Sequence, residues 1–150
     1  MVDIKSRLAH SRILILGPAS DRVLSLRHLL ASVAPGDVEC LRHADEALQK
    51  LFAARFDALF LEIEEVGAEL RRLVTSLRRD PNSLNPMVPV FGVLPSPSLP
   101  VVQKVRDLGV TDILIWPISM ATLQKKLLAA LSTPRPFVLG TTFIGHAGCG

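Results

Sequence analysis

The hydrophobic positions of this 150-residue chain follow two alternating patterns. Five short segments are almost continuously apolar and have no polar face, which is typical of strands buried on both sides of a parallel sheet. They span residues 12–16, 38–41, 56–63, 88–94 and 111–115. A carboxylate, Glu62, lies near the end of the middle segment. Since ligands of parallel sheets gather where the strands end, we take Glu62 as the first candidate for chemistry.

Between these segments, apolar residues recur every three or four positions, which indicates amphipathic helices. The first helix is capped by Ser20 or Asp21 and is ended by Pro35–Gly36. The other four cover residues 44–55, 66–79, 99–108 and the stretch between Ser119 and Ser132. Strands that alternate with helices predict an α/β protein whose parallel sheet has helices on both faces.

The last 18 residues differ from the rest of the chain, because they contain Pro134, Pro136 and four glycines. Such a composition interrupts regular structure. We therefore predict a domain of residues 1–132 followed by a C-terminal arm of residues 133–150. The apolar residues Phe137 and Phe143 lead us to expect that the arm docks on its own chain or on a second subunit.

The composition is that of a globular protein, with 49% hydrophobic and 21% charged residues and a net charge of +3. The only notable basic group is a set of four arginines that we expect to form a solvated helix face: Arg71, Arg72, Arg78 and Arg79. Because the charge is mild and no DNA-binding motif is present, we expect no binding to nucleic acid.

The two cysteines, Cys40 and Cys149, stand in unrelated contexts, and Cys40 is expected to be a small core residue. Without a disulfide framework, a reducing compartment is expected. The first 11 residues lack the apolar centre of a signal peptide, and no apolar run approaches the roughly 18 residues needed to cross a bilayer. We therefore expect a soluble, cytoplasmic protein that does not enter the membrane.

Four segments of the chain resemble the receiver domain of bacterial two-component response regulators. They are Arg12-Ile13-Leu14-Ile15-Leu16, Phe56-Asp57-Ala58-Leu59-Phe60-Leu61, Val88-Pro89-Val90-Phe91-Gly92-Val93 and Gly109-Val110-Thr111-Asp112-Ile113-Leu114-Ile115-Trp116-Pro117-Ile118. The last is the most specific, since it joins a Gly-x-x-Asp run, an apolar strand and a proline. The resemblance covers about residues 11–131. It implies a flavodoxin-like (βα)5 sandwich with sheet order 2-1-3-4-5, and a cis peptide bond between Trp116 and Pro117.

Receivers transfer a phosphoryl group to an aspartate that follows the third strand. This chemistry needs a carboxylate nucleophile and a Mg²⁺ ion held largely by carboxylates. The resemblance places the acidic pair of the metal site on Gly17 and Pro18, whose side chains cannot bind a metal. It places the phosphoacceptor on Glu62, which is one methylene longer than aspartate.

The remaining two positions of the pattern also differ. The hydroxyl residue after the fourth strand falls on Leu94, and the lysine before Pro117 falls on Trp116. A cation and a hydroxyl are the groups that would stabilise the phosphoryl oxygens. We therefore predict a degenerate receiver without catalytic residues, metal or cofactor. Glu62 is then either a permanent mimic of the charged state or a leftover carboxylate facing water. Trp116 either fills the vacated pocket, which we favour, or anchors an interface.

The resemblance implies a protein partner, namely a histidine kinase, a response regulator or another signalling protein, and a possible homodimer. In the family, the face of the fourth helix, fifth strand and fifth helix makes such contacts. The interface candidates, most of which must also serve the core, are Val101, Val105, Leu108, Trp116, Leu123 and Leu127, together with Phe137 and Phe143 of the arm.

Other functions have less support. A receiver that still accepts phosphate would use Glu62 or Glu64. A small-molecule-binding or enzymatic flavodoxin-like domain would need a Gly-rich phosphate loop after the first strand, and residues 17–20 are too short and rigid for one. Zinc would have only the pair His146 and Cys149. Asp21 is expected to cap a helix or to be exposed.

Overall fold

The computed structural model describes residues 4–34 and 36–132. Their five strands form one parallel sheet. The C-terminal arm predicted for residues 133–150, with Phe137, Phe143, His146 and Cys149, lies outside the described residues. The strands are β1 (Arg12–Leu16), β2 (Asp37–Leu41), β3 (Ala58–Glu62), β4 (Val90–Leu94) and β5 (Asp112–Ile115). Their order is β2-β1-β3-β4-β5, which confirms the predicted flavodoxin-like sheet.

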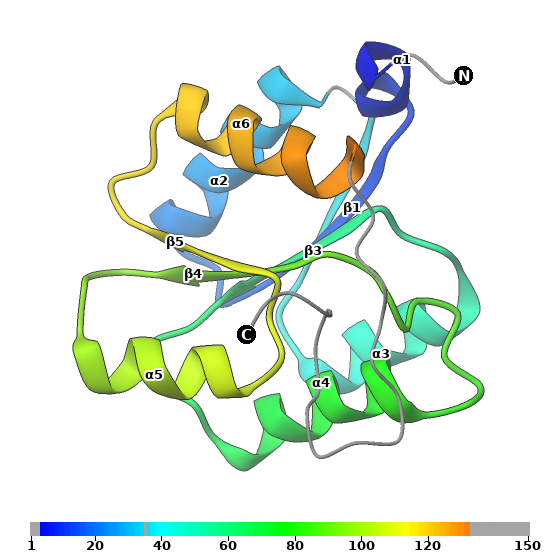
Figure 1. Cartoon of the computed structure of the whole chain (residues 1–150), viewed down its shortest axis with the longest axis vertical. Coiled ribbons are helices and arrows are strands. Elements are labelled where there is room, and N and C mark those ends of the chain that lie inside the picture. Colours follow the sequence, from blue (N-terminus) through cyan, green and yellow to red (C-terminus); the bar gives the residue numbers. More distant parts are fainter. Residues whose placement is uncertain (1–3, 35, 133–150) are drawn as a thin grey trace.

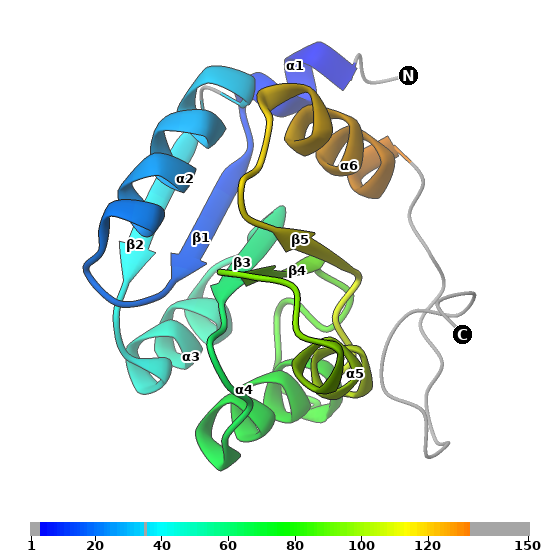
Figure 2. The same cartoon turned by 90° about the vertical axis from the view of Figure 1, so that its left-hand side faces the viewer.

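The helices cover both faces of this sheet (Figures 1 and 2). They are α1 (Ile4–Ala9), α2 (Asp21–Val33), α3 (Ala44–Ala53), α4 (Ala68–Arg79), α5 (Leu99–Asp107) and α6 (Met120–Ser132). Helices α2 and α6 lie on one face, and α3, α4 and α5 lie on the other. The five later helices confirm the predicted alternation, whereas α1 was not predicted.

Each face of the sheet has its own apolar core. Leu14, Leu59 and Leu61 belong to the cluster beneath α3, α4 and α5, while Ile15 and Phe60 belong to the cluster beneath α2 and α6. This division follows from the alternation of side chains along a strand, because successive residues point to opposite faces. Both faces are buried, so the strands read as continuous apolar runs.

Several predicted boundaries were too generous. Strand β4 begins at Val90 rather than at residue 88, since Pro89 precedes it and has no amide hydrogen for the ladder. Helix α4 begins at Ala68 rather than at residue 66, and Gly67 is its N-cap. Cys40 is half-buried in β2, and burial raises the pKa of its thiol against the opposing influence of Arg27.

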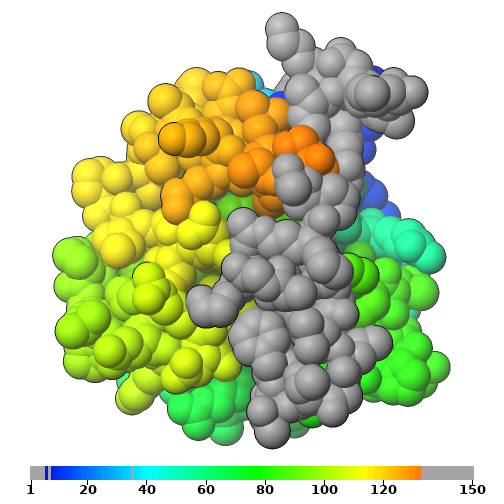
Figure 3. Space-filling view, in the orientation of Figure 1, coloured from blue at the N-terminus to red at the C-terminus, as the bar shows by residue number. Residues whose placement is uncertain are grey.

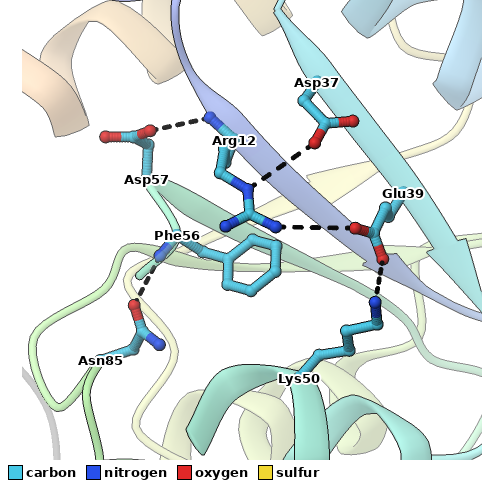
Figure 4. Close-up of polar contacts among 7 residues, drawn as sticks. All are labelled: Arg12, Asp37, Glu39, Lys50, Phe56, Asp57 and Asn85. Carbon is cyan, nitrogen blue, oxygen red and sulfur yellow. Dashed lines mark hydrogen bonds and ion pairs between the residues drawn. The ribbon is translucent and has the colours of Figure 1, made fainter. Parts of the chain in front are cut away.

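The amino ends of the strands carry a network of polar contacts. Asn85, in the loop before β4, accepts the amide hydrogen of Phe56 at 2.7 Å and donates to the carbonyls of Leu51 and Ala54 at 2.6 and 2.8 Å. Figure 4 shows the contact between Asn85 and Phe56 and, beside it, a group of charged side chains around Arg12. The Arg12 guanidinium forms ion pairs with acidic residues of strand β2 and lies over the Phe56 ring. The network joins the starts of β1, β2 and β3.

The prediction that Arg78 belongs to a solvated helix face is wrong. The four arginines of α4 do not all form a solvated face, because the Arg78 side chain is buried and only 1% of the residue is exposed. Its guanidinium donates to the carbonyls of Pro86, Val88 and Gly109 at 3.1, 2.6 and 3.2 Å. The side chain thereby ties α4 to the segments that lead into β4 and β5.

Among residues 4–34 and 36–132, no helix is both long enough and apolar enough to pass through a membrane.

Candidate functional site

The candidate site lies at the carboxyl ends of the strands, where Glu62 is the last residue of β3. The Glu62 side chain is only 1% exposed. It therefore does not face water, and the interpretation of Glu62 as a leftover solvated carboxylate is wrong. The strand register places Glu62 beside Val93 of β4, so the carboxylate sits near the middle of this edge rather than at its rim.

Arg22, in the first turn of α2, binds the Glu62 carboxylate. Its Nε donates to Oε1 of Glu62 at 3.0 Å, and its Nη2 donates to Oε1 of Glu64 at 3.1 Å. The guanidinium thus spans both carboxylates, although the arginine side chain is itself 44% exposed. Sequence reasoning missed Arg22, because nothing in the spacing of residues 22 and 62 marks them as neighbours.

The second carboxylate oxygen of Glu62, Oε2, has no hydrogen-bond partner among the described residues and is buried. Gly17 provides the space beside it, since a Cβ built on Gly17 would lie 3.8 Å from this oxygen. The same Cβ would lie 2.9 Å from Cγ2 of Val23 and 3.0 Å from Cβ of Glu62. Position 17 therefore has neither the carboxylate of the receiver pattern nor room for a side chain.

These residues do not fit the Mg²⁺ ion that the receiver pattern implies. Mg²⁺ prefers octahedral oxygen coordination, and Gly17 and Pro18 offer no side-chain oxygen. Across residues 4–34 and 36–132, no three His, Cys, Asp or Glu side chains come together where they could hold a metal ion. Asp21 is exposed as predicted, and Ser20 is the N-cap of α2, with its Oγ accepting the amide hydrogen of Val23 at 3.2 Å.

The other two positions of the receiver pattern, Leu94 and Trp116, lie in apolar surroundings. Leu94 is buried at the end of β4, and its carbonyl accepts the amide hydrogen of Trp116 at 2.9 Å. The Trp116 side chain packs against the apolar cluster beneath α2 and α6. Its Nε1 is buried and finds no acceptor within the described part of the chain. The Trp116–Pro117 bond is cis, as the resemblance implied.

Four of the interface candidates cannot supply a contact surface. Val105, Leu108, Leu123 and Leu127 are buried core residues, because they form the inward sides of α5 and α6. Only Val101 and Trp116 of the described candidates are partly exposed. Figure 3 shows the surfaces of α5 and α6, with the yellow β5–α6 turn between them.

Other apolar side chains are exposed instead, and most of them lie at the carboxyl edge of the sheet. Leu24 is near the start of α2, Leu99 begins α5, Ile115 ends β5 and Met120 begins α6. The sequence patterns did not single out Leu24, Leu99 and Met120, because these residues lie off the inward faces of their helices. Ile115 was expected only as part of a strand.

Comparison with known proteins identifies the fold. No protein-family model matches the chain, and no curated protein matches it either. Solved structures do match. The receiver domain of the sensor histidine kinase PA1611 from Pseudomonas aeruginosa, which was solved with a magnesium ion in its active-site cleft, has a TM-score of 0.71 and 18% identity, with 83% of this chain and 100% of that one covered.

Two further structures lead to the same fold. A two-component response regulator from Clostridium difficile has a TM-score of 0.67 and 22% identity over 82% of this chain and 97% of its own. The chemotaxis response regulator CheY4 of Vibrio cholerae has a TM-score of 0.66 and 22% identity over 81% of this chain and 99% of its own.

Proposed function

We propose that this chain, which has the fold of a response-regulator receiver domain, is a signalling module of a two-component pathway that acts by protein contact and without phosphorylation. The observation that carries the proposal is the contact of Arg22 with Glu62. A cation supplied by the chain itself occupies the carboxylate at the position where a receiver would accept the phosphoryl group.

The geometry around Glu62 supports this proposal in two ways. A phosphoacceptor must present a carboxylate oxygen to an incoming phosphoryl group, whereas Oε1 of Glu62 is bound by Arg22, and Gly17 and Pro18 provide no side-chain oxygen for a Mg²⁺ ion beside Oε2. The developing charge on the phosphoryl oxygens must also be stabilised by groups aimed at it. Leu94 and Trp116 stand where those groups would be, and neither side chain carries a charge.

The exposed apolar side chains support a role in contact. Leu24, Leu99, Ile115 and Met120 belong to four different elements that all meet the carboxyl edge of the sheet. Exposed apolar groups at one edge of a domain are candidates for a protein-binding site. The partner we infer is a signalling protein, such as a histidine kinase or a response regulator.

Incubation with acetyl phosphate and Mg²⁺, followed by intact mass spectrometry, tests the absence of phosphorylation. We expect no phosphorylated species in the wild-type chain. A phosphoryl adduct that disappears in the Glu62→Gln variant would contradict the proposal. The Arg22→Ala variant separates the two causes of inertness, because an adduct only in this variant would show that Arg22 alone protects Glu62.

Affinity capture from the native host tests the contact surface. A partner that binds the wild-type chain should be lost in the Met120→Lys variant, because a charge would enter the apolar surface. Leu84→Lys is the matched control, since Leu84 is also exposed but lies before β4, at the opposite edge. A partner that is equally retained by both variants would place the contact elsewhere.

A further inference from the structure

A cleft opens at the carboxyl ends of β1, β2 and β3, next to Glu62. It has a volume of about 220 Å³, and its polar lining comes from Gly17, Arg42, Glu62 and Glu69. The cleft lies where the sheet reverses its order, because the chain leaves β1 for β2 on one side and continues with β3 on the other. In open α/β sheets, this reversal point is where ligands bind.

Glu62 lines the cleft and carries a hydrogen-bond acceptor that lacks a donor within the described part of the chain. Oε2 of Glu62 is buried and has no partner among the described residues, and it lies beside the bare backbone of Gly17. A buried carboxylate oxygen without a donor is unfavourable, so the site is complementary to a group that brings N–H donors. Oε1 is already engaged by Arg22, which leaves Oε2 for the ligand.

The rim of the cleft holds charges of both signs. Arg42 follows β2, and Glu69 is in the first turn of α4. Both are exposed, and neither forms an ion pair within residues 4–34 and 36–132. The N-cap of α4 is Gly67, which offers no side-chain acceptor to the first turn, so the positive end of this helix dipole reinforces Arg42.

We propose that this cleft binds a small zwitterionic molecule of the α-amino acid class. Its ammonium group donates to Oε2 of Glu62 and faces Glu69, while its carboxylate pairs with Arg42. The volume agrees with this size, since it equals that of about seven liquid water molecules and is below that of sites for drug-sized ligands. The proposed site does not depend on whether Glu62 can be phosphorylated.

The test is a binding screen of the full chain against each of the common amino acids at millimolar concentration, read by saturation-transfer NMR. Calorimetry then gives the Kd of the strongest binder. We expect the amide of that amino acid, which lacks the carboxylate, and its deaminated acid, which lacks the ammonium, each to bind at least tenfold more weakly.

Variants locate the site. Arg42→Ala and Glu69→Gln should each raise the Kd about tenfold or more, and both positions are exposed, so the fold should be kept. The matched controls are Arg55→Ala and Glu46→Gln, which lie outside the cleft, with Glu46 in the first turn of α3 as Glu69 is in that of α4. Their Kd should equal that of the wild type.

Three results would overturn the proposal. The first is the absence of any binder in the screen, which would mean that Oε2 is met by water alone. The second is binding that Arg42→Ala leaves unchanged. The third is displacement of the amino acid by Mg²⁺ alone, which would make the cleft a cation site. A phosphoryl adduct on Glu62, by contrast, would contradict only the proposed absence of phosphorylation.

Discussion

The two edges of the sheet differ in how many hydrogen bonds their buried polar side chains make. At the amino edge, Asn85 uses both its amide oxygen and its amide nitrogen on backbone groups, and Arg78 donates to three carbonyls. At the carboxyl edge, Oε2 of Glu62 and Nε1 of Trp116 are buried and have no partner among the described residues.

This contrast separates the parts of the molecule that hold the fold together from the part that is free to serve a function. Satisfied buried polar groups fix the geometry of the segments they join, whereas unsatisfied ones cost stability and persist where another role maintains them. The amino edge is therefore the structural end of the domain. Substitutions at the two edges should change the free energy of unfolding by different amounts, and the following four substitutions test this difference.

The largest loss is expected for Arg78→Met. Methionine fills much of the same volume but leaves the carbonyls of Val88 and Gly109 buried without a donor, and we expect unfolding to become easier by about 3 kcal/mol or more. Urea denaturation measures this change. Arg71→Met on the exposed side of α4 is the control and should stay within about 0.5 kcal/mol of the wild type. Equal losses would mean that the guanidinium contacts contribute little.

Asn85→Ala should follow, with a loss of about 2–3 kcal/mol, because one buried amide hydrogen and two carbonyls lose their partner. Asn82→Ala, in the same loop but exposed, provides the comparison. Thermal unfolding by circular dichroism would show the difference as a lower Tm for Asn85→Ala alone. A similar Tm for the two variants would refute the structural role of Asn85.

Gly17→Asp restores one carboxylate of the receiver pattern and should still lower stability by about 1–2 kcal/mol, since its Cβ would crowd Val23 and Glu62. Gly67→Asp is the control with the opposite expected sign. A Cβ at Gly67 would meet no described residue within 4 Å, and an aspartate at an N-cap stabilises a helix by a few tenths of a kcal/mol over glycine. Denaturant titration compares them, and a stabilised Gly17→Asp would show that the site has room for a carboxylate at position 17.

Trp116→Phe should have the smallest effect. Phenylalanine keeps most of the packing and removes the N–H, which has no acceptor among the described residues, so stability should be unchanged or higher by less than about 1 kcal/mol. Trp116 is the single tryptophan of the chain, so unfolding should be followed by circular dichroism rather than by fluorescence. A loss of more than about 2 kcal/mol would show that the indole nitrogen has a partner after all.

The sheet and the later helices were predictable because burial on two faces leaves a strong pattern. Continuous apolar runs for the strands and a three-to-four spacing for the helices are direct consequences of the packing. Helix α1 left no such pattern, since it has only six residues, and Leu8 is its one side chain that the described structure places in the core.

The burial of Arg78 had a signal that charge alone obscured. Position 78 comes four residues after Val74, so it shares the inward face of α4. Its identity as arginine suggested water, whereas its position in the helical period indicated the core. A long side chain that can reach three carbonyls satisfies both constraints.

The candidate site was only half predictable. The positions of Gly17, Glu62, Leu94 and Trp116 follow from the ends of the strands, which sequence patterns locate well. Arg22 does not, because its contact with Glu62 joins residues 40 positions apart and depends on the rotamer of one exposed side chain. The closed space at Gly17 is likewise a property of packing and not of any motif.

The pairing of Arg22 with Glu62 has a consequence for how such a module could convey information. Under the proposed function, a charge that is built into the polypeptide cannot be added or removed by another enzyme, so Glu62 would have no phosphorylated and unphosphorylated forms. A change in output would then have to come from the number of copies of the module in the cell or from a ligand that binds in the cleft beside Glu62.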